Sequence, residues 1–261
     1  MKVSLGIVHG ATVDSWFFHS IVGLLTTQSM EGHTLDDHVC IRSGPLLSAG
    51  RGQLVGSFLQ HSKSDALLML DSDQVASPAT IYTLIDTFER ARAEHDRLGI
   101  LAGITYVQKF PRDDTPYPNI WMPHPKAPYG QVQMTTYPPD SLIEISAAGC
   151  SNMIVHREVL EEFATQNVNP FHHVSLVDYP LLAQTLPSLD DPTKVAETIQ
   201  KAVWDADQWG EDLSFCARVR ANNWRMFAHT GIIFDHSKPM LLGEPEYLAA
   251  VARHSQGEPP E

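Results

Sequence analysis

Two aspartates separated by one serine follow the clearest buried strand of the sequence. Residues 66–70 read Ala-Leu-Leu-Met-Leu and run directly into Asp71-Ser72-Asp73. In open α/β sheets, ligands bind at the carboxyl ends of the strands, and two carboxylates two positions apart can share a hard cation that neutralises a diphosphate. Asp and Ser are also ordinary turn residues, so capping of the following turn is the alternative interpretation.

A second pair of acidic residues opens a predicted helix. Trp209-Gly210 precedes Glu211 and Asp212, and residues 213–219 have the apolar spacing of a helix. Acidic side chains in a first turn gain roughly 0.3 to 1 kcal/mol from the helix dipole, which explains one of the two. A carboxylate at the edge of a cleft could instead accept the proton of an attacking hydroxyl, and we take Asp212 as the first candidate for that base and Glu211 as the second.

His236 is the third candidate, because it follows the apolar run 231–234 at the end of a predicted strand. A lone histidine is more often structural than a ligand, and the chain contains 13 of them. Neutral imidazole is nevertheless a common ligand of manganese-like ions, and a strand end can face the same cleft as the aspartate pair. We therefore group His236 with Asp71 and Asp73 as a candidate metal site.

Alternating strands and helices are expected to position these residues. The predicted strands are Val3–Val8, His38–Ile41, Ala66–Leu70, Ile100–Thr105, Leu142–Ile145, Met153–Val155 and two short strands within Arg225–Phe234, broken at Thr230-Gly231. The predicted helices are Ser15–Leu25, one carrying Leu54 to Leu59, one capped by Ser77 ahead of Pro78, Glu158–Ala164, one from Asp191-Pro192 to Trp204, and Leu213–Val219. This pattern is typical of a single α/β domain.

Residues 110–129 contain six prolines, which is too many for a helix or a central strand. We expect a surface excursion there that adds nothing to the core. Its surroundings gather the basic residues Lys109, Arg112 and Lys126, and together with Trp121 they are candidates for recognising an acceptor.

The composition limits the classes of function. Lys and Arg total 18 against 31 Asp and Glu, a formal charge of −13 that disfavours a broad grip on a nucleic-acid backbone. Cys40, Cys150 and Cys216 are too far apart for a zinc or disulfide framework, and no apolar run of about 18 residues occurs. We expect a cytoplasmic protein without a membrane span.

In their order along the chain, Asp71-Ser72-Asp73, Gly210-Glu211-Asp212 and His236 resemble motifs of the GT-A superfamily of glycosyltransferases, particularly family 2 and its relatives, several of bacteriophage type. Asp71 and Asp73 match the DxD motif of that family. Glu211 and Asp212 look like its acidic catalytic motif, and His236 matches its late metal-binding histidine. Two further segments are similar to family patterns: Gly50-Arg51-Gly52-Gln53-Leu54-Val55 near the donor and the glycine turn and strand from Ala148 to Arg157 near the acceptor.

The resemblance implies a GT-A, Rossmann-like mixed sheet flanked by helices. It implies one domain over residues 1–240, with a nucleotide-sugar-binding half at about 1–106 and an acceptor-binding half at about 107–240, followed by a tail at 241–261. The residues expected to contact the donor are His9, Arg51, Asp71, Ser72 and Asp73.

The implied activity is metal-dependent transfer from a nucleoside-diphosphate sugar, with Mn²⁺ or Mg²⁺ held by Asp71, Asp73 and His236. Inversion at the anomeric carbon is the expected outcome, with retention left open. A nucleotidyltransferase that makes the sugar nucleotide and an inactive sugar-nucleotide-binding module are the alternatives. The acceptor classes left open are a glycan, a metabolite, a protein and a modified DNA base.

Overall fold

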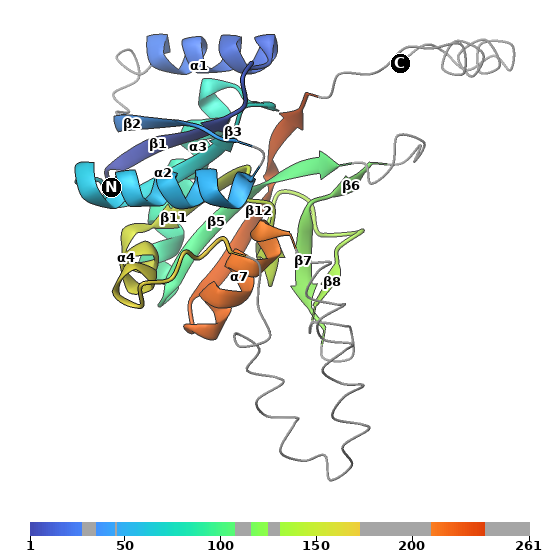
Figure 1. Ribbon diagram of the computed structural model, residues 1–261. Coiled ribbons are helices and arrows are strands. Elements are labelled where there is room, and N and C mark those ends of the chain that lie inside the picture. The colour runs from blue at the N-terminus through green and yellow to red at the C-terminus, as the bar shows by residue number, and fades with distance from the viewer. Residues whose placement is uncertain (28–34, 45, 108–115, 125–130, 173–209, 238–261) are drawn as a thin grey trace, which may run out of the picture.

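The computed structural model describes residues 1–27, 35–44, 46–107, 116–124, 131–172 and 210–237 (Figure 1). The helices are α1 (Ser15–Thr27), α2 (Leu47–His61), α3 (Pro78–Glu94), α4 (Arg157–Thr165) and α7 (Glu211–Ala221). The strands are β1 (Val3–His9), β2 (Leu35–Arg42), β3 (Ala66–Asp71), β4 (Gln74–Val75), β5 (Leu98–Val107), β6 (Tyr117–Pro118), β7 (Ile120–Pro123), β8 (Gln131–Gln133), β9 (Leu142–Glu144), β10 (Ala147–Ala148), β11 (Asn152–His156) and β12 (Arg225–His236). The predicted helix from Asp191 to Trp204 and the expected tail lie outside the described residues.

A mixed sheet in the order β2-β1-β3-β11-β5-β12-β4 forms the centre of the fold. β1 is parallel to β2 and to β3, whereas β11 runs antiparallel to both β3 and β5. β12 returns parallel to β5. The antiparallel insertion of β11 allows segments from the first and last thirds of the chain to reach neighbouring positions in one sheet.

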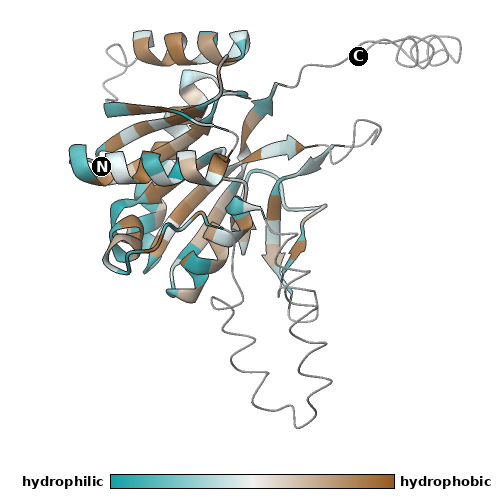
Figure 2. Ribbon diagram, in the orientation of Figure 1, coloured by the Kyte–Doolittle hydropathy of each residue, from teal (hydrophilic) through white to brown (hydrophobic). Residues whose placement is uncertain are grey.

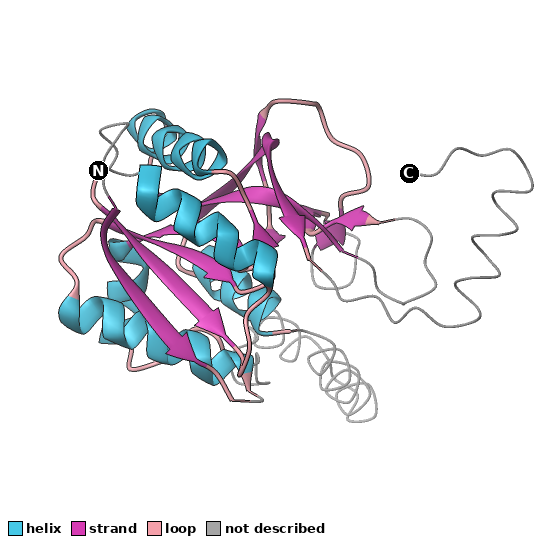
Figure 3. Ribbon diagram, turned by 90° about the horizontal axis from the view of Figure 1, so that it is seen from above, coloured by secondary structure: helices cyan, strands magenta, loops and turns pink. Residues whose placement is uncertain are grey.

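Helices cover both faces of this sheet, as the view from above shows (Figure 3). One apolar core lies between the sheet and α2, α4 and α7, where Phe58, Phe163 and Phe215 are buried. The other lies between the sheet and α1 and α3, where Phe17 and Phe88 are buried. The strands between the two cores are correspondingly hydrophobic over much of their length (Figure 2). The predicted α/β class is therefore confirmed.

Local sequence accounts for the ends of two helices. Ser77 caps α3 by accepting a hydrogen bond from the Thr80 backbone N–H at 3.1 Å, and Pro78 occupies the first helical position, as predicted. Asp14 accepts from the backbone N–H of Trp16 at 2.8 Å ahead of α1. Both caps fix where a loop at the carboxyl edge of the sheet enters a helix.

The proline-rich stretch differs from the prediction in its described part, residues 116–124. It forms β6, which pairs with β5, and β7, which joins β8 and β10 in a small second sheet. The side chain of Ile120 is fully buried in the core beneath α7. The expectation that this stretch adds nothing to the core is therefore wrong: Pro118 and Pro123 lie in the short strands β6 and β7, and Ile120 between them packs into the core.

The last strand also differs from its prediction. β12 is one strand of 12 residues rather than two short ones. The signal at Thr230-Gly231 marks an irregularity, since the register against β5 shifts between Ala228 and Ile233. The strand therefore continues as far as His236, where it also pairs with β4.

Candidate functional site

The turn after β3 is tied to the end of β12. β4 pairs antiparallel with β12, with Gln74 opposite His236, and the Ser237 backbone N–H donates to the Asp73 carbonyl at 2.8 Å. Asp71 ends β3, and Asp73 lies in the turn between β3 and β4. Residues more than 160 positions apart in the sequence therefore meet at this edge of the sheet.

His236 and Asp73 contact each other at this edge. His236 Nε2 lies 3.0 Å from Asp73 Oδ2, and His236 Nδ1 lies 3.3 Å from the Tyr106 carbonyl oxygen. The Asp73 side chain is 37% exposed, so the pair is open to solvent on the carboxylate side. A histidine whose Nδ1–H donates to a backbone carbonyl has its Nε2 lone pair oriented toward a ligand.

The geometry of this pair fits a divalent cation. Two ligand atoms at about 2.1 Å from an octahedral ion, in neighbouring positions, lie about 3 Å apart, and carboxylate oxygen with imidazole nitrogen is a donor set suited to Mn²⁺. Within the described residues, however, no three His, Cys, Asp or Glu side chains converge as a metal-holding group. Among the described residues, Asp73 and His236 would therefore share an ion with ligands from elsewhere, such as the substrate or water.

A chain of three buried polar side chains, called the relay below, ends in a hydrogen bond to Asp73. The Asn152 side-chain amide donates to Thr105 Oγ1 at 2.5 Å, and Thr105 Oγ1 donates to Gln74 Oε1 at 2.8 Å. Gln74 Nε2 in turn donates to Asp73 Oδ1 at 3.4 Å. Sequence reasoning missed these three residues, although each is a polar residue beside or within an apolar strand, which was a usable signal.

Asp14 is a further residue that the sequence did not single out. Its backbone N–H donates to the Ser72 carbonyl at 3.4 Å, which places the loop after β1 beside the turn that carries Asp73. A hydrogen bond from the Ser237 side chain lowers the pKa of the Asp14 carboxyl, so this group is ionised at neutral pH. Asp14 therefore adds negative charge to this edge of the sheet, beyond the charges of Asp71 and Asp73.

The other predicted acids gather around Arg51 on α2. Arg51 Nη2 donates to Asp71 Oδ2 at 2.8 Å, while Nη1 donates to Glu211 Oε1 at 2.5 Å and to Asp212 Oδ1. The Arg51 side chain is only 2% exposed. The predicted metal trio is therefore divided in the structure: Asp73 and His236 face each other, whereas one oxygen of Asp71 is bound to Arg51.

The environment of this cluster shifts two pKa values. Burial raises the pKa of Asp71 to about 6 against the opposing effect of Arg51, with Asp212, Asp73 and Glu211 adding to the rise. Burial, and then the negative charge of Asp212, raise the pKa of the Cys150 thiol well above its usual range. Cys150 therefore stays protonated, and its thiol is hydrogen-bonded with Asp212.

His9 and Ser72, the remaining predicted donor contacts, lie at the same edge. His9 ends β1, and its Nδ1 lies 2.8 Å from the Gly10 carbonyl oxygen. Val8 pairs with Asp71 in the neighbouring strand, so His9 emerges beside Ser72. Both stay proposed donor contacts.

Trp121, predicted to recognise an acceptor, lies in β7 and pairs with Ala147 of β10, next to the predicted glycine turn at Gly149. It is partly buried against the core beneath α7. Lys109, Arg112 and Lys126 lie outside the described residues.

Comparisons with known proteins support the fold and no closer relationship. No protein-family model and no curated protein matches the sequence. A197 from STIV aligns with a TM-score of 0.53 and 12% identity, covering 92% of this chain and 87% of that one. GalNAc-T7, solved with UDP, GalNAc and Mn²⁺, aligns with a TM-score of 0.52 and 9% identity, covering 92% of this chain and 44% of that one.

This chain therefore spans less than half of the length of GalNAc-T7. At such identities the likeness shows the fold alone: a mixed sheet flanked by helices, as in GT-A-like glycosyltransferases. The fold expected from the sequence motifs is confirmed. In the described part of the chain, no helix has both the length and the apolar character that crossing a bilayer requires.

Proposed function

We propose that the protein transfers a sugar from a nucleoside-diphosphate sugar to an acceptor hydroxyl with the help of a divalent cation. The observation that carries this proposal is the 3.0 Å approach of His236 Nε2 to Asp73 Oδ2 at the carboxyl edge of the sheet. Asp73 and His236 would hold Mn²⁺ or Mg²⁺. When bound there with the diphosphate, the ion stabilises the negative charge that develops on the leaving nucleoside diphosphate.

Negative charge at this edge favours a cation over a direct approach of the diphosphate. Asp14, Asp71 and Asp73 all lie in or beside the turn after β3, and the whole chain carries a formal charge of −13. A diphosphate therefore needs a cation between itself and these carboxylates. This is the physical reason for proposing metal dependence.

The acceptor base is proposed to come from the first turn of α7. Asp212 is 27% exposed and Glu211 is 19% exposed, so neither carboxylate is sealed from an incoming hydroxyl. Asp212 has its Oδ1 on Arg51 and is also hydrogen-bonded with the Cys150 thiol. An oriented carboxylate that accepts the acceptor proton during in-line attack gives inversion at the anomeric carbon.

A panel of nucleoside-diphosphate sugars tests the proposal. The purified protein is incubated with each sugar nucleotide in Mn²⁺, in Mg²⁺ and in excess chelator, and release of nucleoside diphosphate is measured. We expect one donor class to be hydrolysed slowly with metal alone, and hydrolysis to stop in chelator and in Asp73→Ala. Absence of metal-dependent release from every donor would contradict the proposed activity.

The same preparation separates the two rival functions. A nucleotidyltransferase would release pyrophosphate from a nucleoside triphosphate and a sugar 1-phosphate. An inactive binding module would bind a sugar nucleotide without releasing either product. The three functions therefore differ in what is released: a nucleoside diphosphate, pyrophosphate, or nothing. One set of reactions distinguishes them.

A further inference from the structure

We infer that Arg51 is a positioning residue, whose guanidinium holds the carboxylates of β3 and of α7 in one arrangement and does not contact the donor. The inference deepens the proposed function, since its catalytic consequence rests on the acids of α7 serving the acceptor. It reverses the expectation from the sequence, in which Arg51 approaches the nucleotide or its diphosphate.

The hydrogen bonds of Arg51 leave no terminal nitrogen uncommitted. Nη2 binds Asp71 Oδ2 at 2.8 Å, and Nη1 binds Glu211 Oε1 at 2.5 Å as well as Asp212 Oδ1. These bonds use three of the five guanidinium N–H donors, and a diphosphate would have to reach the remaining Nη2–H or Nε–H on a side chain that is only 2% exposed. Arg51 is therefore placed as an internal bridge rather than as a ligand-binding arginine.

The bridge joins two parts of the chain that carry different proposed roles. Asp71 precedes the turn that holds Asp73 on the donor side, and Glu211 and Asp212 open α7 on the acceptor side. One planar guanidinium contacts both sides at once, which a lysine ammonium on a flexible stem does far less well. Arg51 thus fixes the distance between the donor-side turn and the proposed base.

The glycines on either side explain how an arginine becomes buried here. A Cβ added at Gly50 would lie 2.7 Å from the Ser43 Cβ and 3.2 Å from a Val8 methyl group. A Cβ added at Gly52 would lie 2.5 Å from the Asn169 side-chain nitrogen. Gly50 therefore lets α2 approach the ends of β1 and β2, and Gly52 lets it approach the segment after α4, which allows Arg51 to reach all three acids.

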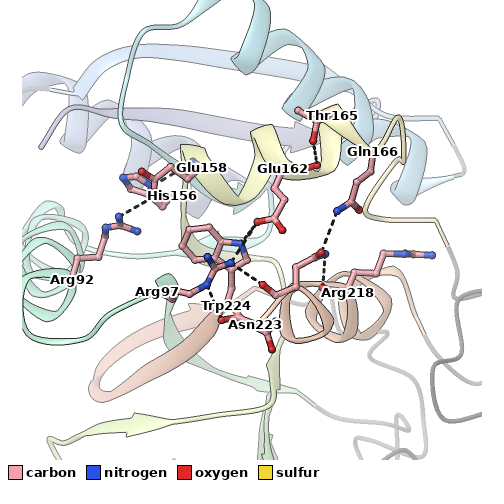
Figure 4. Close-up of polar contacts among 11 residues, drawn as sticks. Arg92, Arg97, His156, Glu158, Glu162, Thr165, Gln166, Arg218, Asn223 and Trp224 are labelled. Carbon is pink, nitrogen blue, oxygen red and sulfur yellow. Dashed lines mark hydrogen bonds and ion pairs between the residues drawn. The ribbon is translucent and has the colours of Figure 1, made fainter. Parts of the chain in front are cut away.

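The far end of α7 is fixed by other contacts, which Figure 4 shows. Arg97 donates to the backbone carbonyls of Asn222 at 2.8 Å and of Asn223 at 3.1 Å, directly after α7. Trp224 Nε1 donates to Glu162 Oε2 of α4 at 2.7 Å. These contacts hold the carboxyl end of α7, and Arg51 binds the two acids of its first turn at the other end.

Charge balance gives a test that needs no substrate. Arg51 is the only cationic side chain that the described residues bring within hydrogen-bonding distance of Asp71, Glu211 and Asp212. In wild type, Asp212→Asn removes a partner of Arg51 and should lower the urea midpoint of unfolding. In an Arg51→Met background, the same change removes one of three unbalanced carboxylates and should raise the midpoint.

Arg157 provides the matched control for this cycle. Its guanidinium donates to the backbone carbonyls of Ser62 and Ser64 and lies over the Phe58 ring, so it contacts α2 and the loop after it without sharing an acid with Arg51. Asp212→Asn should shift the midpoint equally in wild type and in Arg157→Met. If Asp212→Asn lowers the midpoint by the same amount in the Arg51→Met background as well, Arg51 does not bridge these carboxylates. If Arg51→Met does not fold, the equally uncharged Arg51→Gln takes its place in the cycle.

Turnover then tests positioning itself, using the sugar nucleotide that wild type hydrolyses fastest. Arg51→Lys should lower kcat by about 10²-fold with donor KM nearly unchanged, because misplaced groups cost rate rather than binding. Arg157→Lys should change neither. A raised donor KM with unchanged kcat would show that Arg51 contacts the donor and would overturn the inference. If wild type hydrolyses no donor, the proposed function fails, while the urea cycle still decides whether Arg51 is the bridge.

Discussion

At the scale of single residues, the two neighbouring acids of α7 differ in their surroundings. Both bind Arg51 Nη1, but Asp212 is also hydrogen-bonded with the buried Cys150 thiol. Because burial keeps the pKa of this thiol high, Cys150 acts as a neutral hydrogen-bond partner rather than as a competing anion. The extra contact fixes the orientation of Asp212, which supports it as the base ahead of Glu211.

Replacement of each acid by its amide tests this assignment. Asp212→Asn should slow transfer by roughly 10²- to 10⁴-fold with donor and metal binding retained, and Glu211→Gln should be milder. If Asp212 only caps its helix, its loss would cost about 0.5 to 2 kcal/mol of stability and little activity per folded molecule. Transfer rates and melting temperatures measured on the same two variants decide, and a fully active Asp212→Asn enzyme eliminates it as the base.

At the scale of elements, the site depends on three strands that carry polar residues in the interior. Asn152 begins β11, Thr105 lies near the end of β5, and Gln74 begins β4, and their side chains form one relay ending on Asp73. Buried polar groups are costly unless they are hydrogen-bonded, and this relay satisfies all three while holding one carboxylate. The relay links the main sheet to the proposed metal pair.

Removal of the central hydroxyl should weaken the proposed metal site without unfolding the protein. Thr105→Val keeps the side-chain shape but removes the two hydrogen bonds of the Thr105 hydroxyl, so Gln74, which donates to Asp73, loses the contact that orients it. Supporting contacts behind a metal ligand are typically worth about 10- to 100-fold in metal affinity. Mn²⁺ affinity, measured by the electron spin resonance of the free ion, reports this loss. Thr87→Val, a buried threonine of α3, is the control, and equal affinities in the two variants would contradict a role for the relay.

The sequence predicted elements best where local pattern and buried surface agree. The run from Ala66 to Leu70 is apolar because both faces of β3 are covered, and Ser77-Pro78 begins α3 through purely local contacts. Local pattern could not show that β12 continues through Gly231, since the continuity comes from pairing with β5 and β4. Nor could it show that Ile120 is buried, because the small sheet that covers it is formed by distant residues.

At the scale of the whole molecule, the order of the motifs along the chain predicts that the candidate residues lie at one edge of the sheet. It does not predict their individual contacts. The grouping of Asp73 with His236 follows from strand ends meeting, which sequence can suggest. The separation of Asp71 from that pair depends on the guanidinium of Arg51, whose burial is decided by the packing of α2 against the strand ends. Nothing in the sequence around Arg51, which lies between two glycines, indicates that its side chain is buried.

The proposed acceptor-binding half leads to a prediction about residues 107–130. Lys109→Ala and Arg112→Ala should raise the KM for the acceptor more than the KM for the donor, since β7, in the described part of this stretch, joins the small sheet beside the proposed acceptor turn at Gly149. Steady-state kinetics with each substrate varied in turn measure both values. Loss of donor affinity alone in both variants would assign these residues to the other half of the site.

The most direct test of the account is whether a nucleoside diphosphate stabilises the protein only through a cation held by Asp73 and His236. Melting temperatures are measured with UDP, GDP, CDP and ADP, each with Mn²⁺ and with chelator, for wild type, Asp73→Ala, His236→Ala and the exposed neighbour Asp235→Ala. A ligand at 100 times its Kd stabilises the folded state by about 2.7 kcal/mol. We predict such a shift in wild type and in Asp235→Ala with one diphosphate and Mn²⁺ together, and its loss in chelator, in Asp73→Ala and in His236→Ala. An equal metal-dependent shift in Asp73→Ala and His236→Ala, or no shift in wild type with any of the four diphosphates, would contradict the account.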